Sequence, residues 1–401
     1  MKIISKLFVL IIVAVFASCS DDTPQAPAGG GGANEGDNYT AVRMQKLKFS
    51  TELPGDDYSW VSTGPDGGTS LVSTAKECIF LAKDAGEYNL KLTVKDGSSE
   101  EVRNFAITVK GETDAYSPYM ATVYEFVPAP GQFVNIMPEY ENGDTKESMC
   151  RKVEESVCGP DGGLVSLGSC GGYMVFGFDH TVVNVAGKKD FAIYGNSIYN
   201  ENENGQMTSA SSEPGVVYVS LDVNQNGIPD DPWYELAGSE YSKPEVIKGY
   251  QITYKRPVEG KTPIPDPANS VTDKEYISWT DNHGGTGYVE KNMFHAQNYY
   301  PAWISADELT YTVSLLPQNG YRQGTGPIFI QKPYDWGYVD NWPNNMTDKN
   351  SFDISWAVDS EGNKVNLSGA DFIKVVTGVI QMCGWIGETS TEISSAKDLH
   401  L

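Results

Sequence analysis

Short runs of β-forming residues, separated by turn residues, recur along most of this 401-residue chain. Beyond residue 160 the runs are rich in Val, Ile, Phe and Tyr and are bounded by Gly, Asn, Asp or Pro. They read YMVFGF, DFAIYG, VVYVSL, YQITYK, YTVSLL, IFIQK, FDISWAV and DFIKVVTGV. No long stretch has apolar residues at helical spacing, and only CRKVEESV suggests a short helical turn. We therefore expect an all-β chain in which residues 115–401 form a large jelly-roll β-sandwich.

A smaller β domain is expected over residues 39–112. In the segment EYNLKLTVKDG, Leu90, Leu92 and Val94 alternate with polar residues before an Asp-Gly turn, as in a half-buried strand. The segment FAITVK repeats this alternation. Together with YSW, these segments resemble the PKD-type immunoglobulin-like sandwich. The resemblance implies a spacer or adhesion module, and no catalytic constellation is visible in it.

The first residues have the pattern of an export signal. Lys2 and Lys6 precede an apolar stretch, residues 7–17, which is too short to span a bilayer comfortably. The following Phe-Ala-Ser-Cys resembles the cleavage site of bacterial lipoproteins, which implies removal of residues 1–18 and lipidation of Cys19. The Ser-Asp-Asp after it resembles the tag that sends Bacteroidota lipoproteins to the outer face of the outer membrane. A plain secretory signal with an unrelated Cys is the alternative.

Residues 19–38 are rich in Pro, Gly and Asp and have no apolar period, so they are expected to be a flexible tether. The formal net charge is −24, and removal of residues 1–18 makes it more negative. A chain this acidic does not bind nucleic acid through general electrostatics; cations or neutral polar ligands fit it better. Cys150 and Cys158 close a short loop that a disulfide could bridge.

The segment LDVNQNGIPDDPWYEL contains the densest group of oxygen-bearing side chains. Asp222, Asn224, Asn226 and Asp230 alternate around a Gly, and Asp231 follows. Such loops wrap hard cations, so a structural Ca²⁺ ion is the expected cofactor. The twelfth position from Asp222 is a Trp rather than the Glu of an EF-hand. The alternative is a turn whose Asp and Asn side chains cap their own backbone.

Two aromatic loops are the candidate ligand-binding surface. They read QNYYPAWI and KPYDWGYVDNW, and they combine flat rings with acids and amides. Such groups suit sugar rings or a corrin-type ligand, because stacking supplies contact area and polar groups set orientation. Burial of the rings in the core is the alternative. The candidate residues are Tyr299, Tyr300, Trp303, Tyr334, Trp336 and Trp342.

Catalytic motifs give little support to an enzyme. The chain has neither a G-x-S-x-G elbow nor a P-loop nor a dinucleotide fingerprint. Its four histidines show no zinc-ligand spacing, and His180 beside Asp179 is expected to be a structural hydrogen-bonded pair. A glycoside hydrolase needs two carboxylates at a fixed separation, which no local motif singles out. We therefore expect a non-enzyme, with hydrolase activity as a minor alternative.

The order of motifs in the large domain carries a further resemblance. LGSCGGYMVFGFDH, DFAIYGNSI, SSEPGVVYVSL, WTDNHGGTGYV and GWIGETSTEI resemble the large domain of PKD-containing surface lipoproteins of gut Bacteroidota. More distantly, they resemble galactose-binding-like jelly rolls. Some members of the PKD-containing lipoprotein family sit beside cobalamin uptake systems. The resemblance implies a surface lipoprotein that captures a cobamide for a TonB-dependent transporter; a glycan-binding protein and an adhesive or structural surface protein are the alternatives.

Overall fold

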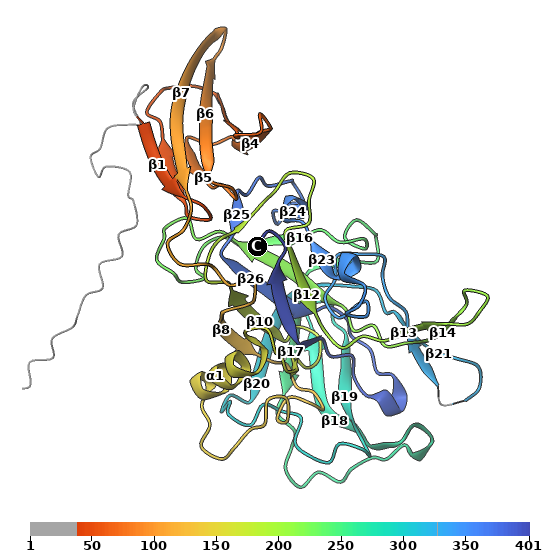
Figure 1. Cartoon of the computed structure of the whole chain (residues 1–401). Coiled ribbons are helices and arrows are strands. Elements are labelled where there is room, and N and C mark those ends of the chain that lie inside the picture. Colours follow the sequence, from red (N-terminus) through yellow and green to blue (C-terminus); the bar gives the residue numbers. More distant parts are fainter. Residues whose placement is uncertain (1–37, 327) are drawn as a thin grey trace, which may run out of the picture.

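The computed structural model describes residues 38–326 and 328–401. The expected signal peptide, the lipidation site Cys19 and nearly all of the tether lie outside the described residues. Almost all regular structure is β, which confirms the expected all-β sandwich class. Figure 1 shows a small sandwich, in red and orange at the top, that stands on a much larger domain.

The small domain consists of two sheets. The larger sheet is antiparallel except where its first strand pairs in parallel with β7. In spatial order its strands are β1 (Asn38–Val42), β7 (Ser99–Lys110), β6 (Gly86–Asp96), β3 (Asp57–Thr63) and β4 (Thr69–Ser73). The second sheet pairs β2 (Leu47–Ser50) with β5 (Glu77–Phe80).

The core of the small domain follows from the alternation of its strands. Leu90, Leu92 and Val94 of β6 are buried, as expected. They pack with Trp60, which is fully buried and stacks on Phe105 at a ring separation of 5.8 Å. One apolar face on each sheet is therefore enough to close this sandwich.

A six-stranded antiparallel sheet forms the middle of the large domain. Its strands are, in order, β24 (Ala357–Val358), β16 (Tyr234–Leu236), β15 (Gly215–Ser220), β26 (Phe372–Thr377), β10 (Tyr173–Gly177) and β8 (Thr122–Val127). Val217 and Val219 of β15 pack into one core and Val216 into another. Both faces of this sheet are buried, which explains why its strands read as continuous apolar runs.

Two layers cover this sheet, so the large domain has one layer more than the two-sheet jelly roll expected from the sequence. On one side lies a four-stranded sheet of β19 (Thr286–Asn292), β18 (Val271–Asp281), β17 (Ile247–Lys255) and β20 (Glu308–Leu315). The other side is covered by α1 (Lys146–Val157) together with short paired strands. These are β23 (Ser351–Phe352), β12 (Phe191–Tyr194), β28 (Ser395–Asp398), β9 (Val165–Ser166), β27 (Glu392–Ile393), β11 (Val182–Val183) and β25 (Gly369–Ala370).

The helix α1 is longer than the single turn expected at this place. Thr145 caps its N-terminus, and Met149, Val153 and Val157, spaced four residues apart, face the core. Cys150 and Cys158 are both free thiols. Eight residues of helix separate them by about 12 Å, which is too far for the suggested disulfide.

The remaining elements lie at the edges of the large domain. Two hairpins project from it (Figure 1): β13 (Tyr199–Glu201) with β14 (Met207–Ala210), and β21 (Gly320–Arg322) with β22 (Phe329–Gln331). The 3-10 turns are η1 (Pro267–Asn269), η2 (Thr347–Asn350), η3 (Ile354–Trp356) and η4 (Gly384–Ile386). The run FDISWAV is therefore two short strands separated by η3 rather than one strand.

Candidate functional site

Three of the six candidate aromatic residues lie inside the protein. Tyr299 and Tyr300 are fully buried, and Tyr334 is 8% exposed. The hydroxyl of Tyr300 donates to the carbonyl of Ala306 at 2.8 Å, and that of Tyr334 donates to the carbonyl of Pro317. Their ring faces are covered by protein, so the prediction that they stack on a ligand is corrected here. The buried alternative holds because the rings are enclosed and the hydroxyls of Tyr300 and Tyr334 each donate to a carbonyl of the protein.

The three tryptophans are scattered. Trp303 is half-buried and stacks on Phe126 at 6.0 Å. Trp336 is 38% exposed and packs against Trp356 at 4.5 Å. Trp342 is half-buried, and its indole Nε1 donates to the carbonyl of Tyr334 at 2.7 Å. Trp342 therefore contacts another predicted residue, Tyr334, whereas Trp303 and Trp336 pack against rings outside the predicted set. The six aromatic residues do not form one exposed surface, because Tyr299, Tyr300 and Tyr334 are buried.

The Asp/Asn loop closes on itself. The carboxylate of Asp222 accepts from the backbone N–H groups of Asn226 and Gly227, each at 3.1 Å. The Asn226 amide donates to both oxygens of Asp230 at 3.2 and 3.0 Å, and the amide of Asn224 donates to Asp230 at 3.1 Å.

Asp231, the last residue of the predicted calcium set, accepts from the N–H of Val223 at 3.2 Å. The oxygens of this loop therefore face N–H donors of the loop itself, which is the Asx-turn alternative. Calcium at these positions stays a prediction.

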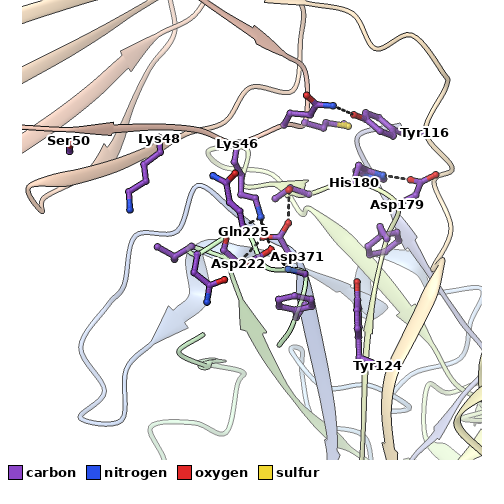
Figure 2. A pocket seen from close by; sticks show the side chains of 18 residues that line it. Lys46, Lys48, Ser50, Tyr116, Tyr124, Asp179, His180, Asp222, Gln225 and Asp371 are labelled. Carbon is purple, nitrogen blue, oxygen red and sulfur yellow. Dashed lines mark hydrogen bonds and ion pairs between the residues drawn. The ribbon is translucent and has the colours of Figure 1, made fainter. Parts of the chain in front are cut away.

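A cavity of about 850 Å³ lies between the two domains. This same Asp/Asn loop forms one of its walls, β2 of the small domain forms another, and the ends of β10 and β26 form its base. Figure 2 shows two half-buried rings, Tyr116 and Tyr124, on one side and Lys48 on the other. The lining also includes Gln45, Lys46, Phe178, Asp179, His180, Thr181, Asn224, Gln225, Asp371 and Phe372.

Lys46 joins the two domains at the centre of this cavity. Its ammonium group lies 2.8 Å from the carboxylate of Asp371 and 2.9 Å from the carbonyl oxygen of Asp222. Asp371 also accepts from the hydroxyl of Thr181 at 2.6 Å and from the Asp222 N–H at 2.7 Å. The Lys46 side chain is only 12% exposed. This network therefore fixes the small domain against the rim of the large one.

His180 stands beside this network as a structural group. Its two ring nitrogens lie 2.7 Å from carboxylate oxygens of Asp179 and Asp398. Burial lowers the pKa of His180, but the hydrogen bonds to Asp398 and Asp179 outweigh it and raise the pKa above its usual value. The rings of Tyr116 and Phe178 lie 5.0 and 5.7 Å from the imidazole. The expectation of a structural Asp-His pair agrees with this geometry, and Asp398 is the partner that sequence reasoning missed.

Sequence reasoning also missed the other key residues of this cavity. Lys46 lies far from Asp371 in the chain, and neither belongs to a motif with a known spacing. Tyr124 is one Tyr among 23. Only the Asp/Asn loop was marked by its composition, and its place in the cavity wall depends on the docking of the small domain.

Comparison with known proteins gives only distant similarities. No family model and no curated protein matches the chain. A SusE-like protein is 8% identical, with 90% of this chain and 95% of that chain covered and a TM-score of 0.27. The SGBP-B protein of a Bacteroides ovatus mixed-linkage glucan utilization locus, solved with a mixed-linkage heptasaccharide, is 11% identical. There 92% of this chain and 95% of that chain are covered, with a TM-score of 0.16.

A third similar structure is a quinonprotein alcohol dehydrogenase-like protein from Bacteroides thetaiotaomicron, at 8% identity and a TM-score of 0.16. The alignment covers 64% of this chain and 47% of that chain, which is less than half of its length. With TM-scores this low, none of these similarities carries an argument about the present chain. In the described part of the chain, no helix is long and apolar enough to cross a membrane.

Proposed function

We propose that this protein is a surface-displayed binding protein that holds a neutral, hydroxyl-rich ligand, a glycan, in the cavity between its two domains. The observation that carries the proposal is the cavity itself. Its volume of about 850 Å³ lies within the usual range for ligand sites. Its lining combines half-buried rings with amides, hydroxyls and charged groups, which is the mixture that sugar recognition uses.

The arrangement of the polar groups favours binding over hydrolysis. Asp371 is held by Lys46 and Thr181, and Asp179 is held by His180 and the N–H of Ser117. A glycosidase needs one carboxylate to donate a proton and a second to attack or to activate water. Carboxylates that are already bonded to fixed protein partners are poorly placed for either task. We therefore propose a binding role in preference to the hydrolase alternative.

The setting of the protein belongs to the same proposal. Cys19 would carry a lipid that anchors the chain to the outer face of the outer membrane, and a TonB-dependent transporter would receive the ligand. The lipid anchor rests on the sequence pattern of residues 1–38, and the transporter rests on the resemblance of the motifs in the large domain. The cobamide prediction differs from the glycan proposal only in the ligand, so one binding experiment can compare the two. A protein with an adhesive role would bind neither the glycan nor the cobamide.

Replacement of Tyr124 by alanine is expected to weaken glycan binding about tenfold or more, because a ring that stacks on a sugar contributes more than 1 kcal/mol. Isothermal titration with a panel of neutral oligosaccharides, including mixed-linkage glucan fragments, measures the effect. Trp336→Ala is the matched control, because this exposed ring lies outside the cavity. Absence of heat with every oligosaccharide would contradict the proposal, and binding of cyanocobalamin alone would support the cobamide prediction instead.

A further inference from the structure

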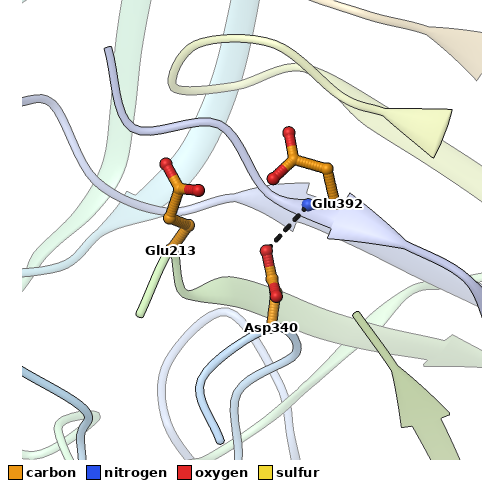
Figure 3. A group of neighbouring side chains, drawn as sticks. All are labelled: Glu213, Asp340 and Glu392. Atoms are coloured by element: carbon orange, nitrogen blue, oxygen red, sulfur yellow. Dashed lines mark hydrogen bonds between the residues drawn. The ribbon is translucent and has the colours of Figure 1, made fainter. Parts of the chain in front are cut away.

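Three carboxyl groups from distant parts of the chain meet inside the large domain. Glu213 precedes β15, Asp340 lies in the loop after β22, and Glu392 begins β27. One oxygen of each group lies within 4.8 Å of the others. Figure 3 shows the three side chains converging on one space. Asp340 and Glu392 are at most 1% exposed, and Glu213 is half-buried.

Backbone donors hold these groups in place. The N–H groups of Asn196 and Glu392 donate to the two oxygens of Asp340 at 2.8 and 3.0 Å, and the N–H of Ser390 donates to Glu213 at 3.0 Å. Asp340 itself has a left-handed backbone with φ of 53°. The carboxyl groups are therefore directed at each other by the fold and do not meet by free side-chain rotation.

The cluster lacks a positive partner. None of the ion pairs within residues 38–326 and 328–401 includes any of the three carboxylates. Buried charges of one sign are costly unless protons or a cation neutralise them.

The side chain of Gln331 is the second, independent observation. It is fully buried, and its Nε2 lies 3.4 Å from Oε1 of Glu213 and 3.1 Å from the hydroxyl oxygen of Thr389. Its own Oε1 has no hydrogen-bond partner. A half-turn of the amide places this oxygen where Nε2 stands, against the cluster. Turned in this way, the amide oxygen lies beside Glu213 and adds a fourth hard oxygen ligand to the three carboxylates.

We propose that Glu213, Asp340, Glu392 and Oε1 of Gln331 bind a Ca²⁺ ion. Calcium bonds oxygen at about 2.3–2.6 Å, so two of its ligands can stand up to about 5 Å apart. The ion would fasten the start of β15, the loop at Asp340 and the short strand β27 near the C-terminus to each other. This site is separate from the Asp/Asn loop and from the cavity between the domains.

The test is direct measurement of bound calcium. The purified full chain is treated with EDTA, reloaded with CaCl₂, dialysed, and assayed for metal content and for the melting temperature. We expect one Ca²⁺ per chain and a melting temperature about 3–5 °C higher than in EDTA. Glu213→Gln should lose the ion and the calcium-dependent rise. In EDTA this variant should melt at or above the wild type, because it removes one of three repelling groups.

Two further variants locate the ion. Gln331→Met keeps all three carboxylates and should weaken calcium binding about tenfold. The double variant D222N/D230N, in the Asp/Asn loop, is the matched control and should retain the ion. Wild-type protein without bound calcium would overturn the proposal. Loss of the ion from D222N/D230N, with retention in Glu213→Gln, would also overturn it and would support calcium in the Asp/Asn loop.

Discussion

Replacement of His180 by alanine is expected to destabilise the large domain by about 3–5 kcal/mol, because it leaves a buried carboxylate without its charged partner. Asp398 is fully buried and lies 2.7 Å from the imidazole. Asp179 loses its contact at the same time but is more exposed, so it contributes less. Chemical denaturation at pH 6 measures the change. A loss below about 1 kcal/mol would contradict the interpretation of His180 as a structural imidazolium.

The same group makes stability depend on pH in a definite direction. Because the folded pKa of His180 is raised, its contribution is fully present below the unfolded value of about 6.5. The contribution is lost as the pH rises through the folded pKa. His180→Gln keeps a polar side chain but does not titrate. The difference in unfolding free energy between wild type and this variant should therefore shrink from pH 6 to alkaline pH, and a constant difference would show that His180 is neutral when folded.

Replacement of Trp60 by alanine is expected to cost about 3–5 kcal/mol in the small domain, because it opens a cavity in the core. Trp60 is fully buried, and its indole Nε1 donates to the carbonyl of Ala75 at 2.9 Å. A loss of this size is comparable with the whole stability of a domain of some 70 residues. The small domain should then unfold near room temperature, while the large domain still melts cooperatively.

Calorimetry distinguishes the unfolding transition of the small domain from that of the large domain. The conservative variant Trp60→Phe should lose less than half of the unfolding free energy that Trp60→Ala loses. This experiment also bears on the proposed function. Lys46, directly before β2, and Lys48 in β2 reach the cavity from the small domain, so unfolding of that domain removes one wall. Ligand binding should disappear in Trp60→Ala. Binding that survives with the small domain unfolded would place the ligand site within the large domain.

Strands and turns could be predicted from the sequence where they depend on residues that are close together in the chain. The alternation around Leu90 and Leu92 predicted a half-buried strand, and the structure has β6 there. The apolar run at residues 216–221 predicted a strand, and β15 is that strand. The Asp/Asn loop was also recognised, but composition alone did not decide whether its oxygens face a cation or their own N–H groups. In the structure Asp222 accepts from backbone donors.

The sequence could not predict which of the candidate aromatic residues are exposed and which are buried. Tyr299 and Trp336 look alike in sequence, since both lie in loops with polar neighbours. Burial separates them, because Tyr299 lies under the four-stranded sheet and Trp336 lies at the surface. The additional layer of the large domain decides this difference, and no periodicity within a short loop reports how many layers will cover it.

The sequence by itself therefore determined the all-β class, the positions of most strands and the composition of the Asp/Asn loop. These properties depend on residues that are neighbours in the chain, where side-chain period and turn chemistry act directly. The tertiary structure alone decided that Lys46 meets Asp371, that His180 meets Asp398, and that Glu213 meets Glu392. Those contacts join residues more than a hundred positions apart, and only the packing of complete layers brings them within bonding distance.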